Sequence, residues 1–131
     1  NLRGGYVSWG NETACYPANT DVTDYFYCVS RMFGWVANSV ILSVWNKVDR
    51  KLNRRLIESV VQSLNLWLNG LMAEEVILGG RIEFLEEENT DTDLMAGIAH
   101  FHIYLAPPSP AKELDFVLEY DVSYLENLFA A

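Results

Sequence analysis

The apolar residues at positions 49–72 recur with helical spacing, and they predict an amphipathic helix over this range. Its apolar stripe follows intervals of three and four residues and consists of Leu52, Leu56, Val60, Leu64, Trp67 and Leu71, widened by Ile57, Val61 and Leu68. Asp49 is predicted to cap the start of the helix, and Gly70 with the two glutamates beyond it marks the end. One broad face of this helix should therefore be buried.

Residues 24–45 form a second stretch in which apolar side chains recur with helical spacing. The stripe consists of Phe26, Val29, Phe33, Val36, Val40 and Val44. Thr20, Asp21 and Thr23 are candidate N-caps in front of it. Glycine inside a helix costs roughly 1 kcal/mol relative to alanine, so we expect Gly34 to lie against the backbone of a neighbouring element. A short link around residues 46–49 should join the two helices into one layer.

After the helices the apolar period changes to two, which is typical of β-strands. A strand is predicted at residues 76–86, with a bend or bulge at Gly79 and Gly80. A second strand is predicted at residues 99–105, before a proline cluster that should end it. The acidic run between the two strands is predicted to be a loop.

The two ends of the chain also carry local patterns. A third strand is predicted at residues 114–122, and its apolar face consists of Leu114, Phe116, Leu118, Tyr120 and Val122. Residues 6–9 favour a short strand or an extended arm between glycines. Residues 124–129 favour a short terminal helix.

Helices that precede strands, without alternation of the two, predict an α+β fold: a two-helix layer packed on a small antiparallel β-sheet, with extended terminal arms. We expect an N-terminal arm or strand at residues 1–19, two helices at 20–72, and the sheet with a C-terminal arm at 73–131. A chain of 131 residues, half of them apolar, has the size of a single domain with one core. No apolar run approaches the roughly 20 residues that span a bilayer. Because the chain opens with Asn1 and carries no leader pattern, we expect it to be part of a longer protein.

The net charge of −9 is unevenly distributed along the chain. Residues 1–73 carry seven basic and five acidic side chains, whereas residues 74–131 carry two basic and thirteen acidic ones. Five basic side chains gather at the start of the first predicted helix, where the helix dipole disfavours cations, and form a basic cluster of Lys47, Arg50, Lys51, Arg54 and Arg55. This basic cluster is either a solvated face or a docking patch for an anionic protein. The acidic second half argues against partners such as nucleic acid or an anionic membrane.

The sequence contains no catalytic or metal-binding constellation, so we expect neither an enzyme nor a cofactor. His100 and His102 could share one face of a strand, but a third zinc ligand with suitable spacing is missing. The acidic run at residues 86–93 has no register that supplies the glycine and the final glutamate of an EF-hand loop. Cys15 and Cys28 fit a reducing compartment, one as a buried apolar side chain and the other as a loop thiol.

Several short motifs follow one another in a definite order. They are GYVSWGNET at residues 5–13, WNKVD at 45–49, VILGGR at 76–81, an N-T…G segment at 89–97 and a proline-rich turn at 104–110. In this order they resemble the C-terminal domain of the contractile tail sheath proteins of phages, prophages and R-type tailocins. The first motif is similar to that family's GxxxWGNRT, and the second to its W-x-V-D link between two helices. Two departures stand out: Glu12 replaces a frequent arginine, and the helix-ending glycine is displaced to Gly70.

The resemblance implies a structural protein that polymerises. Sheath subunits stack as hexameric rings in a helical lattice around a tail tube, and their C-terminal domains lie innermost and link neighbours through exchanged arms. On this interpretation the basic cluster contacts the tube, and residues 114–122 add a strand to the sheet of an adjacent subunit during contraction. The partners would be other sheath subunits and the tube protein, with assembly in the host cytoplasm and a final place in the virion tail. The alternative that the residues leave open is an adaptor or chaperone-like module that presents the basic cluster to an acidic protein.

Overall fold

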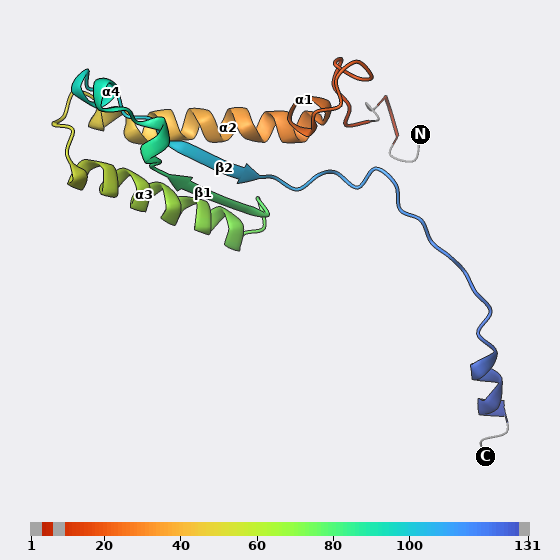
Figure 1. The fold of residues 1–131 in the computed structure, drawn as a ribbon. Helices are drawn as coiled ribbons and strands as arrows, with labels where there is room; N and C mark the ends of the chain where they lie inside the picture. Colours follow the sequence, from red (N-terminus) through yellow and green to blue (C-terminus); the bar gives the residue numbers. More distant parts are fainter. Residues whose placement is uncertain (1–3, 7–9, 129–131) are drawn as a thin grey trace.

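The computed structural model describes residues 4–6 and 10–128. Its body consists of two long helices, α2 (Tyr27–Val44) and α3 (Arg54–Ala73), and a pair of antiparallel strands, β1 (Gly79–Glu83) and β2 (His102–Ala106). Side chains of both helices pack around Ile82 on one face of this sheet. Figure 1 shows the two helices running alongside the pair of strands. The predicted α+β fold, with a two-helix layer on a small antiparallel sheet, is confirmed.

The hydrophobic core lies between α3 and the sheet. Two clusters of buried side chains form it, one of Val60, Leu64 and Ile82 and the other of Leu68, Leu71 and Ile77. Four of these six residues belong to the apolar stripe predicted for α3. Burial of an aliphatic side chain contributes about 1.5–3 kcal/mol, so α3 supplies a large part of the stabilisation. No helix in the described part of the chain has the length and apolar character needed to cross a membrane.

The start of α3 differs from the prediction. The helix begins at Arg54, and Asn53 caps it by accepting a hydrogen bond from a backbone N–H of the first turn at 2.8 Å. Asp49, the predicted cap, lies in the loop before the helix with a positive φ of 64°. A 3-10 turn at Trp45–Lys47 and the loop that follows separate the two helices, so the link is longer than predicted.

The helix predicted at residues 24–45 is interrupted at Phe26. Asp21 caps α1 (Val22–Tyr25) by accepting from a backbone N–H of its first turn, as expected. Phe26 then has extended backbone, with φ −92° and ψ 124°, and forms an isolated antiparallel bridge with Glu12. Pairing with the N-terminal segment therefore prevails over helix continuity at this residue.

The glycines in the helices and strands have roles other than those predicted. Among the described residues, and leaving out its own helix backbone, no atom lies within 4 Å of the position that a Cβ of Gly34 would take, so the predicted close contact is wrong. Close approach occurs instead at Gly80, whose Cβ would lie 3.2 Å from Ile77 Cδ1 and 3.4 Å from Leu105 Cδ1. β1 passes through Gly79 and Gly80 in continuous register with β2, so the predicted bend or bulge does not occur in this strand.

The connection between β1 and β2 has local structure where an acidic loop is predicted. It contains a 3-10 turn at Glu86–Glu88 and a short helix, α4 (Asp91–Met95). Asn89 is buried between them, and its side chain donates to the carbonyls of Leu85 and His100 at 2.8 and 2.9 Å. The same side chain accepts from the N–H of His100 at 2.7 Å. These three bonds hold the two ends of the connection together.

The last part of the chain does not return to the sheet. Residues 107–121 leave the body as an extended segment, with a 3-10 helix at Val122–Leu128 beyond it (Figure 1). The third strand predicted at residues 114–122 is therefore wrong for the isolated chain, because this segment pairs with neither β1 nor β2. Three prolines at its start lack a backbone N–H and uncouple it from β2.

The predicted elements at the two ends are described only in part. Of residues 6–9, only Tyr6 is among the described residues, so the predicted N-terminal strand lies largely outside them. Of the terminal helix predicted at residues 124–129, the described part has 3-10 geometry, and residue 129 lies outside the described range.

Candidate assembly surfaces

The basic cluster extends from the end of the 3-10 turn, at Lys47, through the loop that follows and into the first turn of α3. Arg50, Lys51, Arg54 and Arg55 are exposed, and Lys47 is half-buried. Lys47 Nζ donates to Ser59 Oγ at 2.8 Å, and Arg54 Nε pairs with Glu58 Oε1 at 2.7 Å. An exposed ion pair of this kind contributes under about 1 kcal/mol, so much of the positive charge remains available to a partner.

An apolar groove with a volume of about 740 Å³ opens beside the basic cluster. Side chains of α2, α3 and β2 line it, and most of them are aliphatic. Its charged lining residues are Lys47, Asp49 and Arg50. This hollow, called the basic groove below, suits an apolar segment that also carries negative charge.

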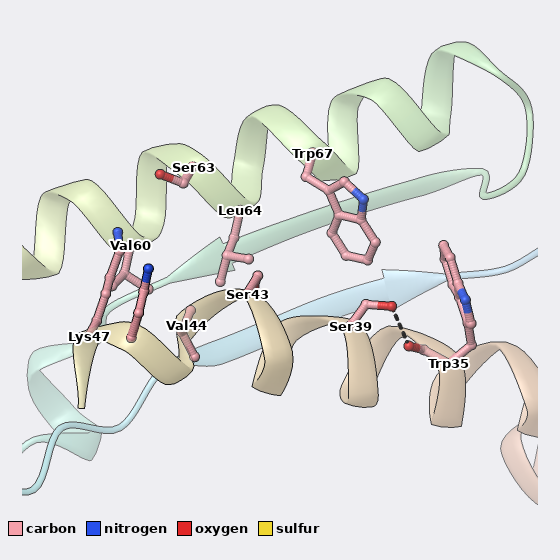
Figure 2. Close-up of a pocket in the computed structure, with 10 residues that line it drawn as sticks. Trp35, Ser39, Ser43, Val44, Lys47, Val60, Ser63, Leu64 and Trp67 are labelled. Atoms are coloured by element: carbon pink, nitrogen blue, oxygen red, sulfur yellow. Dashed lines mark hydrogen bonds between the residues drawn. The ribbon is translucent and has the colours of Figure 1, made fainter.

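A second hollow, of about 350 Å³, lies between α2 and α3 and is drawn in Figure 2. Trp35 and Trp67 stand at one end of it with ring centroids 5.6 Å apart, and Lys47 stands at the other. The hydroxyl of Ser39 donates to the carbonyl of Trp35 at 2.8 Å, and that of Ser63 donates to a carbonyl of its own helix at 2.6 Å. The hydroxyl of Ser43, the third serine that lines the hollow, donates to the carbonyl of Val40 at 2.9 Å. Because all three hydroxyls are bonded within their helices, this hollow offers an apolar surface and no activated nucleophile among the described residues.

Residues 107–121 are called the C-terminal arm below. Residues 111–121 are all exposed. The alternating side chains predicted for an inter-subunit strand are 63–97% exposed, and they are Leu114, Phe116, Leu118, Tyr120 and, at the start of the 3-10 helix, Val122. Single exposed apolar residues are ordinary, but a regular series on an extended segment is typical of an interaction site.

The root of the C-terminal arm is bound to the N-terminal segment, which the sequence pattern does not predict. Lys112 forms an ion pair with Glu12 and donates to the hydroxyl of Tyr25 at 2.8 Å, while that hydroxyl donates to Glu12 Oε1 at 3.0 Å. The hydrogen bond from Lys112, with that from Tyr25, lowers the pKa of Glu12 below its ordinary value. The bond to Glu12, with that to Tyr25, raises the pKa of Lys112. The one feature of the sequence that could have indicated this contact is Glu12, which replaces a frequent arginine of the sheath motif.

The histidines and cysteines do not gather into a metal site. His102 Nδ1 lies 2.7 Å from Glu88 Oε1, and its ring stacks on that of Tyr104 with centroids 4.4 Å apart. Among residues 4–6 and 10–128, no group of three or more His, Cys, Asp or Glu could hold a metal ion. Cys15 and Cys28 are free thiols and both are exposed, so the buried position predicted for one of them is wrong.

Comparison with known proteins identifies one similar sequence of known role. No protein-family model matches this chain. Over 124 residues, which are 95% of the chain, it is 28% identical to the tail sheath protein of Burkholderia phage BcepMu. The match covers 26% of that protein, so the chain spans about a quarter of the length of this relative.

Two solved structures share the fold. With a TM-score of 0.76 and 19% identity, the chain matches part of the PVC sheath complex of an extracellular contractile injection system in its contracted state, covering 88% of this chain and 33% of that one. With a TM-score of 0.75 and 15% identity, it matches a chain of the anti-feeding prophage baseplate, covering 87% and 33%. The resemblance to contractile tail sheath proteins that the motif order indicated is confirmed.

Proposed function

We propose that this chain, which resembles contractile tail sheath proteins in sequence and in fold, is the C-terminal domain of a sheath subunit. In this role it catalyses no reaction and uses no cofactor. It polymerises with other sheath subunits around a tail tube, is assembled in the host cytoplasm and ends in the tail of a virion or a related particle. Similarity to a phage sheath protein and to parts of contractile injection systems supports this structural role. The 26% coverage of the phage relative is consistent with one domain, residues 1–131, of a longer protein.

The observation that carries this proposal is the exposure of the C-terminal arm. An extended segment with regularly spaced apolar side chains is an aggregation liability in a monomer, but it can serve as a joint in a polymer. Added to the sheet of an adjacent subunit, the arm gains main-chain hydrogen bonds, and alternate side chains supply specificity. Strand exchange of this kind keeps neighbours linked while their bodies move as rigid units during contraction.

The basic cluster supports a contact with an acidic tube surface. Each exposed charge pair contributes under about 1 kcal/mol, yet the same pairs recur in every subunit of the lattice and act together. The position of the cluster on an otherwise acidic chain favours one oriented contact over general attraction to anions. The adaptor hypothesis uses the same charges for a different acidic partner, so an assembly experiment has to separate the two.

Electron microscopy of the complete protein that contains this chain tests the proposal. We expect the unaltered protein to form hollow tubes, and a variant that ends at residue 112 to remain folded by circular dichroism without forming them. Normal tubes from the truncated variant would exclude exchange through the arm. A protein that binds an acidic partner through the basic cluster and never polymerises would favour the adaptor.

Charge reversal tests the contact with the tube separately from polymerisation. The triple variant Arg50→Glu, Lys51→Glu and Arg55→Glu should still form contracted tubes alone but should fail to assemble an extended sheath on tail tubes. Arg54 is left unchanged because it already pairs with a glutamate of its own helix. Arg31→Glu, which reverses an exposed charge on α2, is the matched control and should behave as the unaltered protein. Co-assembly of the triple variant at physiological salt would contradict the assigned contact.

A further inference from the structure

The β1 edge of the sheet is already occupied by a side chain. Asn65 of α3 accepts the N–H of Ile82 through its side-chain oxygen at 2.9 Å and donates to the carbonyl of Ile82 through its side-chain nitrogen at 3.2 Å. In an antiparallel sheet, these are the two groups that an added strand would bind at this residue. Asn65 therefore takes the place of a neighbouring strand at Ile82, whereas among the described residues no such bond reaches Gly80, which has the same orientation two residues back along β1.

The β2 edge carries no such cover. Ile82 lies opposite Ile103 in the register, and because Ile82 directs its backbone groups away from the ladder, Ile103 does the same. Leu105, two residues further along β2, has the same orientation. Within the described residues, no hydrogen bond to a loop, turn or side chain reaches the backbone of Ile103 or Leu105. β2 also contains no buried residue, whereas Ile82 in β1 is 2% exposed.

We propose that β2 is the edge that accepts the C-terminal arm of a second copy of this chain, and that Asn65 favours this choice by occupying the backbone groups of Ile82 in β1. The inference rests on the proposed function and adds to it the strand that receives the arm. Without Asn65 both edges would present a pair of free backbone groups to an incoming strand. With it, an arm at β2 can bond both Ile103 and Leu105, whereas an arm at β1 would find the backbone groups of Ile82 already bonded.

The side chains of the arm fit both faces of the β2 edge. On the helix side, Phe101 and Ile103 line the basic groove, which gives space to the alternating apolar residues of an added strand. On the opposite side lie His102 and Tyr104, and the guanidinium carbon of Arg81 lies 4.0 Å from the centroid of the Tyr104 ring. The arm carries aspartate and glutamate at most of its intervening positions, and these acids would lie on the face that holds Arg81, whose guanidinium also pairs with Glu83 at 2.8 Å.

Amide exchange measured by NMR on the nitrogen-15-labelled chain tests the choice of edge. The probe is an unlabelled synthetic peptide of residues 113–126, added in excess. We expect it to slow exchange of the Ile103 and Leu105 amides by about tenfold or more and to leave Ile82 unchanged. A peptide of the same composition, shuffled to remove the period of two, is the control and should slow neither.

Substitution of Asn65 tests its role directly. Asn65→Ala should speed exchange of the Ile82 amide in the free chain by about tenfold or more, and the peptide should then protect Ile82 as well. Asn69→Ala changes an exposed asparagine one turn along α3 and should behave as the unaltered chain. If Asn65→Ala does not fold, Asn65→Asp is the second variant, because it keeps an acceptor for the Ile82 N–H but loses the donor to the Ile82 carbonyl. With this variant too, the peptide should slow exchange of the Ile82 amide.

Two results would overturn the assignment. One is slowed exchange of Ile82 in the unaltered chain on addition of the peptide, and the other is unchanged exchange of Ile103 and Leu105. Either result, with normal tubes formed by the complete protein, would refute the choice of edge and leave the proposed function intact. Failure of the complete protein to form tubes would refute the proposed function instead.

Discussion

Truncation of Phe116 distinguishes an interface residue from a core residue. Its side chain is 81% exposed in the isolated chain and belongs to neither core cluster. Phe116→Ala should therefore change the free energy of unfolding of the isolated chain by less than about 0.5 kcal/mol. A buried phenylalanine would instead cost about 3–5 kcal/mol on the same truncation.

In the assembled sheath the same substitution removes apolar area that pairing would bury. Full burial of such a side chain contributes about 1.5–3 kcal/mol, and most of this area is still exposed in the isolated chain, so each joint should lose about 2 kcal/mol. This is roughly a 30-fold loss in the association constant of a joint. Pelleting of assembled sheath across a concentration series should show a comparable rise in the critical concentration.

Val117→Ala is the matched control, because Val117 adjoins Phe116, is 85% exposed and points to the other face of an extended arm. It should alter neither folding nor assembly by more than a small factor. Equal effects of the two substitutions on assembly would refute the assignment of one apolar face. A loss of several kcal/mol of folding stability on Phe116→Ala would refute the exposure on which the reasoning depends.

Two further predictions concern the body and the root of the arm. Leu68→Ala, at a side chain only 2% exposed, should lower the free energy of unfolding by about 3 kcal/mol in chemical denaturation, whereas Leu66→Ala, 76% exposed on the same helix, should change it by less than about 0.5 kcal/mol. Because the pKa of Glu12 is lowered, its contact with Lys112 is complete above the ordinary glutamate pKa of about 4.3 and is lost as pH falls through the lower pKa of the folded state. Because the pKa of Lys112 is raised, the contact is complete below the ordinary lysine pKa of about 10.4 and is lost as pH rises through the higher pKa of the folded state. The amide shift of Lys112 should report the acid transition, and Glu12→Gln should abolish it; an unchanged titration in that variant would contradict the contact.

The sequence predicted the part of the fold that depends on short-range periodicity. Val60, Leu64, Leu68 and Leu71 are buried because a stripe at helical spacing can be covered only by packing on another element, here the sheet. The start of the same helix could not be predicted in this way. Asp49 and Asn53 are both acceptable caps. The choice between them depends on the loop that joins the two helices, in which Asp49 has a positive φ, and the geometry of this loop is set by the positions of the helix ends.

The candidate site was predicted where it consists of neighbours in the sequence and missed where it does not. The basic cluster could be found because its residues lie within nine positions of one another. Glu12 and Lys112 meet only because the N-terminal segment pairs with Phe26 near the root of the arm. Asn65 is half-buried at the border of the apolar stripe of α3, and nothing in the local sequence indicates that it bonds to the edge of a strand.

The C-terminal arm shows why an alternating pattern is not sufficient to predict a strand within its own chain. Alternation at residues 114–122 defines two faces, but a strand also needs an edge with free backbone groups at the right place. In this chain the β1 edge is bonded by Asn65, and the arm runs away from β2 after three prolines. A segment with strand chemistry and no reachable edge of its own is suited to pairing with a second copy. The prediction of a strand was thus wrong within one molecule, because the arm reaches no free edge of its own sheet. For the same reason we propose that the arm forms a strand with the sheet of a second copy.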